Sequence, residues 1–285
     1  MAPRWHALVE ALHRISTAPQ SRPDALTREL IYAATDALKG SRGFLLIITR
    51  NRIRPRHLRR DPLGGWSPVR YIPTFATPEH QQRVKKLLRN RSLLASDPFS
   101  QEIVRQAGSL RVFLFHEFLA GLPQGSTLPS LELMGMLSTR DRILGCIPMG
   151  RTVECILAVD RSDTQPLFNA EDATTLAEFL PRIGRYLVRV LTSHGFLDHQ
   201  SPLTCREREC YELLLHSLTK AEIAQVMKLS PHSVHQYVSR IYTKLGVNSR
   251  TELMSEWLCA EETFASLKPM PRHHDFPGAA DVESA

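Results

Sequence analysis

The amino-acid sequence predicts an α+β protein of two domains: a mixed sheet flanked by helices, followed by a smaller all-α four-helix domain. Two observations lead to this fold class. The first two hundred residues alternate between helical and strand-like apolar patterns and close on a long helix, which is typical of a sheet covered by helices. The next sixty residues contain four marked helix starts. A chain of 285 residues is long enough for two modest domains.

The elements expected in the first domain follow from apolar spacing and from helix-start residues. Asp24 suits an N-cap, Gly40 suits a helix end, and Pro78 and Pro98 suit a first helical turn. In chain order, we expect helices over 4–16 and 24–39, a buried strand over 43–50, a basic loop over 51–68, a weak strand near 69–74, helices over 78–90 and 97–108, strands over 110–119, 141–150 and 152–161, and a closing helix over about 170–194.

The closing helix carries an apolar stripe that has two interpretations. Acidic residues stand in its first turn, where the helix dipole favours them, and Pro181 can kink it. The 4-3-4-3 spacing of the stripe is typical of a coiled-coil seam, which would pair two chains. The same spacing equally fits packing against the domain's own sheet. The stripe consists of Leu176, Leu180, Ile183, Leu187 and Val190.

The charge of the chain suits a polyanionic partner, but its distribution does not single out the second domain. The net charge is +7. Residues 1–200 hold 27 Lys and Arg against 18 Asp and Glu, a net of +9, whereas residues 201–260 hold 7 against 6, a net of +1. The densest basic segment, 50–60, has six arginines without an interleaved aromatic residue. This composition favours a solvated loop over an extra contact with DNA, a nucleotide or an acidic partner.

Several function classes find little support in the sequence. The five cysteines form no C-x-x-C pair, which favours reduced and mostly buried thiols. The longest strongly apolar run, 44–48, is far too short to span a membrane, and the N-terminal residues lack the pattern of a secretory signal. No P-loop, nucleophile elbow or zinc-ligand spacing is present. We therefore expect a cytoplasmic protein with no membrane partner, no catalytic residue and no metal site, and the sequence identifies no cofactor.

The second domain is marked by four helix starts. Three are capping boxes, in which a Ser or Thr hydroxyl accepts a backbone N–H and a Glu three residues later reaches back to the cap residue. Each Ser or Thr cap stabilises its helix by about 1 kcal/mol. The fourth start is Ser230 followed by Pro231. The expected capping boxes pair Thr204 with Glu207, Thr219 with Glu222, and Ser249 with Glu252.

The second and third helices of this domain are joined by only three residues, 228–230, which forces the sharp crossing of a helix-turn-helix. Residues 230–245 then show an apolar stripe on one side and polar residues on the other. A helix with such a polar face fits the DNA major groove, so base edges and phosphates are the expected contacts. The expected core consists of Leu203, Leu213, Leu214, Ile223, Val226, Val234, Val238, Ile241, Leu245 and Leu253.

This domain resembles the DNA-binding domain of LuxR/NarL-type transcription regulators. The runs LTCREREC, TKAEIA, SPHSVHQYVSRIYTKL and LGVNSR carry the resemblance over about 202–258. In the third helix, Ser233 stands where the family has Thr, His235 where it has Lys, and Tyr237 where it has His. Because His235 replaces a fixed positive charge near the bases, the DNA target cannot be inherited from other members.

The resemblance implies a role for each polar position of the domain. His235, Gln236 and Ser239 occupy the base-facing positions, and a glutamine can read adenine through two hydrogen bonds. Phosphate contacts would set the register and supply salt-dependent affinity. The implied phosphate contacts are Thr219, Lys220, Ser233, Tyr237, Arg240 and Lys244. For any one of these residues, the alternative is a solvated helix face, or a partly buried core position for Tyr237.

The first domain resembles GAF sensor domains over about 20–190. The run GSRGFLLI after the entry helix and the run TVECILAVDRSD, followed by FNAEDATTLAEFL, carry this resemblance, and PAS and other small sensor folds share the layout. The expected organisation is a GAF-like sensor and dimerisation domain over 1–195, a linker over 196–201, a LuxR-type helix-turn-helix domain over 202–262, and a disordered tail over 263–285.

These features predict a sequence-specific transcription regulator that binds double-stranded DNA as a homodimer, with a first domain that senses a small ligand or a protein partner. Two alternatives remain open. One is a GAF-like enzyme that processes a small molecule, which a deep pocket lined by paired acid–base groups would favour. The other is a protein-binding module in which DNA binding is vestigial.

Overall fold

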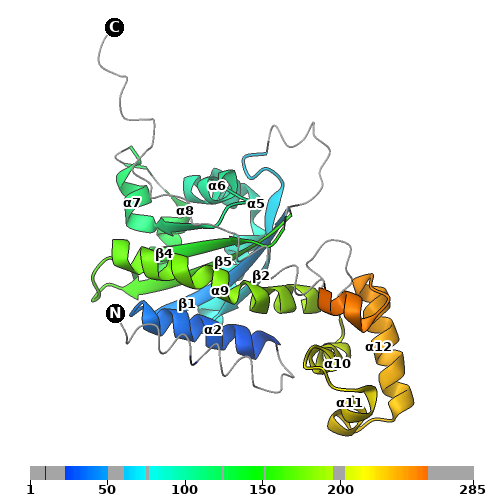
Figure 1. The fold of residues 1–285 in the computed structure, drawn as a ribbon. Helices are drawn as coiled ribbons and strands as arrows, with labels where there is room; N and C mark the ends of the chain where they lie inside the picture. Colours follow the sequence, from blue (N-terminus) through cyan, green and yellow to red (C-terminus); the bar gives the residue numbers. More distant parts are fainter. Residues whose placement is uncertain are drawn as a thin grey trace.

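The computed structural model describes residues 10, 23–50, 61–74, 77–123, 125–126, 128–150, 152–194 and 203–255. Figure 1 shows a sheet with helices around it and a separate group of helices formed by the C-terminal part of the described chain. Apart from Glu10 and Arg50, the helix expected over 4–16 and the basic segment 50–60 lie outside the described residues. The linker over 196–201 and the tail over 263–285 also lie outside them.

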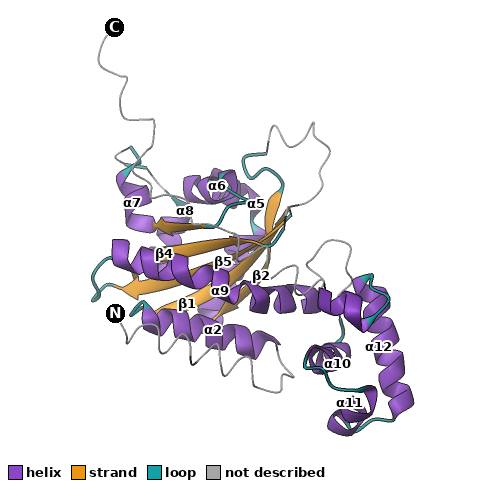
Figure 2. Cartoon of the chain, in the orientation of Figure 1, coloured by secondary structure: helices purple, strands orange, loops and turns teal. Residues whose placement is uncertain are grey.

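Five strands form one antiparallel sheet in the first domain (Figure 2). The sheet order is β2-β1-β5-β4-β3, and each pair of neighbours is antiparallel. The α+β class is therefore confirmed. The strands are β1 (Arg42–Arg50), β2 (Trp66–Pro73), β3 (Arg111–Leu114), β4 (Thr139–Pro148) and β5 (Val153–Ser162).

Helices cover both faces of this sheet (Figures 1 and 2). The helices expected from 24, 78, 97 and 170 are confirmed to within a few residues, whereas three short helices were not predicted. One face carries α2 (Pro23–Ala37) and α9 (Ala170–His194), and the other carries α4 (Pro78–Arg89), α5 (Arg91–Ser96), α6 (Pro98–Arg105), α7 (Phe115–Ala120) and α8 (Pro129–Met136). The unpredicted helices are α5, α7 and α8.

The strand expected over 110–119 is wrong in its second half, because β3 ends at Leu114 and α7 begins at Phe115. Phe115 and Phe118 both lie against Phe99 of α6, with ring centroids 4.7 and 4.9 Å away. Residues three apart share one side of a helix but lie on opposite faces of a strand. A helical turn is therefore needed for both rings to join the same aromatic cluster.

The apolar stripe of α9 packs against the domain's own sheet. Leu176, Leu180, Ile183 and Leu187 are each at most 1% exposed and belong to one core with α2, β1, β4 and β5. The side chain of Val190 lies outside the described residues. Of the two interpretations of the stripe, intramolecular packing thus accounts for every described member, since a seam between two chains would require these side chains to leave the core.

Two glycines allow the helices on this face to approach the strands closely. A Cβ atom at Gly145 of β4 would lie 2.7 Å from both methyl carbons of Leu180 in α9. A Cβ atom at Gly43 of β1 would lie 2.6 Å from Thr35 Oγ1 in α2. Both distances are far shorter than van der Waals contact, so a larger residue would push a helix away from the sheet.

Charged and thiol groups inside the sheet are either paired or kept neutral. Arg111 and Glu154 form a buried ion pair at 2.8 Å, and Arg161 lies 3.2 Å from Asp172 at the start of α9. Such pairing offsets the cost of removing charges from water. Burial raises the pKa of the Cys146 thiol to about 12. Burial also raises the pKa of Cys155, so these two cysteines carry protonated thiols, as expected for core residues.

The second domain packs its helices around a separate small core. Its described helices are α10 (Cys205–Leu215), α11 (Lys220–Met227) and α12 (Pro231–Leu245), and a further helical stretch covers 250–255. Nine of the ten expected core residues are buried, but Val226 is 55% exposed. The buried residues of α11 are Ile223, Ala224 and Met227, and Val226 points away from the side that they share. The prediction for Val226 is therefore wrong.

Two of the three predicted capping boxes are present in full. Thr204 with Glu207 and Thr219 with Glu222 make both reciprocal hydrogen bonds. At the third, the Ser249 hydroxyl accepts from the Glu252 N–H at 3.0 Å, whereas the Glu252 carboxylate accepts from the Asn248 N–H at 2.8 Å. The predicted hydrogen bond from the Ser249 N–H to the Glu252 carboxylate is wrong, because that carboxylate accepts from the N–H of the residue before the cap instead.

The close packing of α9 on β4 predicts opposite effects for two glycine substitutions. Gly145→Ala should lower the free energy of unfolding by about 1–3 kcal/mol, because the added methyl group overpacks against Leu180. Gly135→Ala, in α8, should raise it by roughly 0.5–1 kcal/mol, because nothing lies within 4 Å of its Cβ position and alanine favours a helix. Urea unfolding of both variants measures these free energies. Equal changes in the two variants would contradict the close approach of α9 to β4 at Gly145.

Candidate functional site

Helix α12 presents one buried and one exposed side. It begins after Ser230, whose hydroxyl accepts from the Ser233 N–H at 3.0 Å, and it ends at Gly246, whose φ of 72° favours glycine. The apolar stripe of the helix is at most 4% exposed. The opposite side is therefore fixed outward. The buried stripe consists of Val234, Val238, Ile241 and Leu245.

The turn before α12 sets its angle to α11. Lys228 takes a left-handed conformation with φ 54°, and its N–H bonds back to the Gln225 carbonyl oxygen at 3.3 Å. Only residues 228–230 separate the two helices. This reversal brings the start of α11 beside α12, where Lys220 Nζ lies 3.2 Å from His235 Nδ1. The helix-turn-helix expected from the sequence is thus present.

The predicted base-reading residues share the exposed side of α12. His235, Gln236 and Ser239 are all exposed. Gln236 Nε2 lies 3.1 Å from the Nε2 atom of His232, one turn earlier and also exposed. Sequence reasoning missed His232, although its spacing of four from Gln236 and three from His235 indicates one helix side. The side of α12 that is predicted to face the bases therefore holds two histidines.

The predicted phosphate contacts differ in how exposed their side chains are. Lys220 and Arg240 are exposed, and Arg240 lies over the ring of Tyr237 with its guanidinium carbon 6.0 Å from the ring centroid. Tyr237 is half-buried and packs on the domain core, as in the alternative interpretation of this residue. Ser233 is also half-buried, and its hydroxyl lies 2.9 Å from that of Ser230. Arg240 and Lys220 are thus the most accessible cations of this set.

Thr219 and Lys244 are engaged inside the domain. The Thr219 hydroxyl both accepts from the Glu222 N–H and donates to the Glu222 carboxylate. Lys244 Nζ donates to the buried carboxylate of Glu207 at 2.7 Å, which ties the end of α12 to the start of α10. Although burial raises the pKa of Glu207, hydrogen bonds from Lys244 and Thr204 hold it below its usual value. Lys244 therefore has a structural role beside its predicted phosphate contact.

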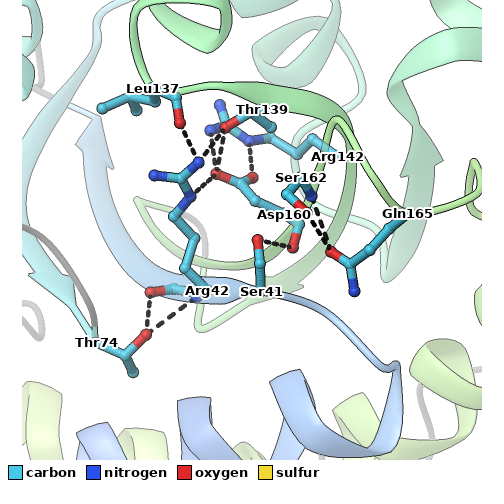
Figure 3. Close-up of polar contacts among 10 residues, drawn as sticks. Ser41, Arg42, Thr74, Leu137, Thr139, Arg142, Asp160, Ser162 and Gln165 are labelled. Carbon is cyan, nitrogen blue, oxygen red and sulfur yellow. Dashed lines mark hydrogen bonds and ion pairs between the residues drawn. The ribbon is translucent and has the colours of Figure 1, made fainter.

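A cavity of about 110 Å³ lies in the first domain, between the sheet and helices α4, α5, α6 and α8. One end carries charged residues from three neighbouring strands, Arg42, Asp160 and Arg142 (Figure 3). Sequence reasoning did not identify this cavity, and charged residues inside predicted buried strands were its only signal. The apolar lining includes Phe44, Leu46, Leu94, Phe99, Leu144 and Ile156.

The described part of the chain contains no group of three His, Cys, Asp or Glu side chains that could hold a metal ion. None of its helices combines the length and apolar character needed to cross a membrane. The cavity and the exposed side of α12 are thus the two candidate sites of the described chain.

Comparison with known proteins assigns the second domain. Residues 201–256 match the family model described as bacterial regulatory proteins, luxR family. Spore germination protein GerE of Bacillus subtilis (strain 168) is 41% identical over 56 residues, which are 20% of this chain and 76% of that protein. Response regulator Rre1 of Synechocystis sp. is 47% identical over 51 residues, which are 18% of this chain and 22% of that protein.

Other matches extend further along the chain. The probable transcriptional regulator ycf29 of Pyropia yezoensis is 30% identical over 145 residues, or 49% of this chain and 61% of that protein. The chain thus spans from 22% to 61% of the length of Rre1 and ycf29. Among solved structures, Escherichia coli SdiA aligns with a TM-score of 0.43 at 14% identity, over 91% of this chain and 98% of that chain.

The ion pair between Lys244 and Glu207 predicts a pH-dependent loss of stability. Lys244→Met should lower the free energy of unfolding of the second domain by about 1–3 kcal/mol at pH 7, because it leaves a buried carboxylate without its cation. The pKa of Glu207 is lowered in the folded state, so its contribution is present above its unfolded pKa and fades as the pH falls through the folded value. The difference between variant and parent should therefore shrink below about pH 4.5.

Denaturant unfolding between pH 3 and pH 8, followed by circular dichroism, checks this prediction. Arg206→Met is the matched control, because Arg206 forms an exposed pair with Glu209 and should change stability by less than about 0.5 kcal/mol. A Lys244→Met variant as stable as the control at pH 7 would contradict the structural role of Lys244.

Proposed function

Because this chain belongs to the luxR family of bacterial regulatory proteins, we propose that it is a transcription regulator whose helix α12 reads double-stranded DNA sequence-specifically. The observation that carries the proposal is the orientation of α12, whose apolar stripe is buried while His235, Gln236 and Ser239 face outward. Amide and imidazole groups on an exposed helix can donate to and accept from base edges in the major groove. Arg240 and Lys220 flank them and supply phosphate contacts.

The first domain serves as the sensor in this proposal. Its cavity lies between the sheet and four helices and combines an apolar wall with a charged end, as expected of a small-molecule site. Binding there would bias DNA recognition only if the ligand has different affinities for the free and DNA-competent arrangements. The sensor takes a small ligand rather than a protein partner, since the cavity is lined from inside the domain.

The enzyme alternative is less well supported than the sensor. Rre1 is named as a response regulator and ycf29 as a probable transcriptional regulator. Asp160, the acid at the charged end of the cavity, is held by two arginines, which suits charge compensation more than proton transfer. The pair of His116 Nδ1 and Asp141, 2.9 Å apart, is not part of the cavity lining.

A homodimer in the cytoplasm completes the proposal. Two reading heads on two half-sites would raise the affinity well above that of a single small interface. The described stripe of α9 is not available for pairing, so the dimer contact would lie on another surface of the chain.

Base reading and phosphate contact by α12 predict two distinguishable losses of DNA affinity. Gln236→Ala should weaken binding to a selected site by about 1–3 kcal/mol while leaving affinity for random DNA nearly unchanged. Arg240→Ala should weaken both and reduce the slope of log affinity against log salt by about one. Gel-shift titrations at several salt concentrations measure both effects. Arg182→Ala, an exposed arginine of α9, is the control, and unchanged affinity of the Gln236, Arg240 double variant would refute the assignment.

The proposed dimer predicts cooperative use of two half-sites. DNA carrying two copies of the selected half-site about 10 base pairs apart should bind at least ~10-fold more tightly than DNA with one copy. Changing the spacing by about 5 base pairs, half a helical turn, should remove this gain. Sedimentation velocity on the free protein and on both complexes gives the stoichiometry, and a single chain on the two-copy DNA would exclude the dimer.

A further inference from the structure

The cavity of the first domain has a polar end whose chemistry can be argued from its contacts. Arg42 of β1, Asp160 of β5 and Arg142 of β4 stand side by side across three neighbouring strands. Arg142 donates to both carboxylate oxygens of Asp160, at 2.6 and 2.9 Å. Figure 3 shows Arg42 on the other side of the same carboxylate, where it also donates to the Leu137 carbonyl oxygen and to Thr139 Oγ1. Two arginines share one carboxylate, so Arg42, Arg142 and Asp160 together hold one excess positive charge.

Two hydrogen-bond donors at this end have no acceptor among the described residues. Arg42 Nε is inaccessible and lies 3.7 Å from Asp160 Oδ2, which is beyond hydrogen-bonding distance, and no other acceptor among the described residues reaches it. The hydroxyl of Tyr71 also makes no hydrogen bond within the described part of the chain. Its ring packs on Phe44, with centroids 5.4 Å apart. Burial raises the pKa of Tyr71 to about 12, so its hydroxyl remains a donor at neutral pH.

The remaining acid of the cavity is fully engaged. The two carboxylate oxygens of Asp97 accept from the backbone N–H and the hydroxyl of Ser100 and of Ser130, between 2.6 and 3.2 Å. Asp97 caps α6 through these bonds, which occupy its oxygens but leave its negative charge in the lining. The unsatisfied donors lie instead beside two arginines that share one carboxylate, so an anionic acceptor suits that end of the cavity.

The rest of the cavity limits the size and polarity of its occupant. Its walls are mainly aliphatic and aromatic, and its volume is about 110 Å³. An apolar cavity of about 150 Å³ is known to hold benzene. The cavity is smaller than that, so its occupant is at most a single ring or a short branched chain, and a long acyl chain would require α4, α5, α6 or α8 to move. A phosphate would leave the apolar wall without a partner.

We infer that the cavity binds a small carboxylate with a compact apolar body, such as a single aromatic ring, with its carboxylate at Arg42 and Tyr71. This inference rests on the proposed sensor function and specifies the class of its ligand. Because Arg42 Nε is covered, the guanidinium contributes its positive charge, and the Tyr71 phenol supplies the directed hydrogen-bond donor. A neutral ligand of the same shape would leave the positive end uncompensated.

Benzoate and its neutral isostere benzamide test the inference on the full chain. Ligand-observed NMR titration should show benzoate binding at least ~10-fold more tightly than benzamide, because the charge-assisted hydrogen bonds are lost with the amide. Tyr71→Phe should weaken benzoate roughly 5- to 10-fold by removing one hydroxyl, and should leave benzamide little changed. Tyr32→Phe is the matched control, since Tyr32 is 39% exposed and lies on α2, across the sheet.

Arg42→Gln provides a second variant if Tyr71→Phe does not fold, and circular dichroism melting reports the fold of each. Equal affinities for benzoate and benzamide, or unchanged benzoate affinity in a folded Tyr71→Phe or Arg42→Gln variant, would overturn the inference. Gel shifts on the same protein preparation show whether a failure concerns the ligand class or the proposed regulator function. Sequence-specific DNA binding without benzoate binding overturns the ligand class alone. Benzoate binding by a protein that selects no DNA sequence supports the ligand class and overturns the regulator.

Discussion

The burial of the α12 stripe is the contact on which the proposed DNA-reading surface depends. Val234, Val238 and Ile241 lie in the core shared with α10 and α11, so the helix cannot turn about its axis without exposing them. A rotation by one residue, about 100°, would place His235 or Tyr237 where Gln236 now lies and would bring part of the buried stripe to the surface. The three-residue turn and the left-handed Lys228 then fix the angle of the helix. Packing in the interior thus decides which side chains of α12 face outward.

The first domain shows how one sheet supports two different interiors. Alternate residues of β5 point to opposite faces, so Leu157 and Val159 join the core beneath α2 and α9, while Ile156 and Ala158 join the cluster beneath the shorter helices. Asp160 continues the second series and reaches the cavity. The position of the charged end therefore follows from the same two-residue period that builds the apolar core.

Features set by local sequence could be predicted, and features set by long-range pairing could not. The bounds of α9 and the capping boxes at Thr204 and Thr219 depend on residues within one or two turns. Val226 was misassigned because an apolar residue in a short helix does not reveal which side is covered. The cavity escaped prediction because Arg42 meets Asp160 only through the pairing of β1 with β5, more than a hundred residues apart in sequence.

The burial of the two strand cysteines determines how the sheet domain responds to oxidants in the cell. Cys146 and Cys155 are fully covered, one on each face of the sheet. Peroxide attacks thiolates, and neither residue forms one at neutral pH while the sheet is folded. The sheet domain is thereby shielded at these two positions from oxidative stress, and sulfenylation there would mark molecules that have already lost their fold.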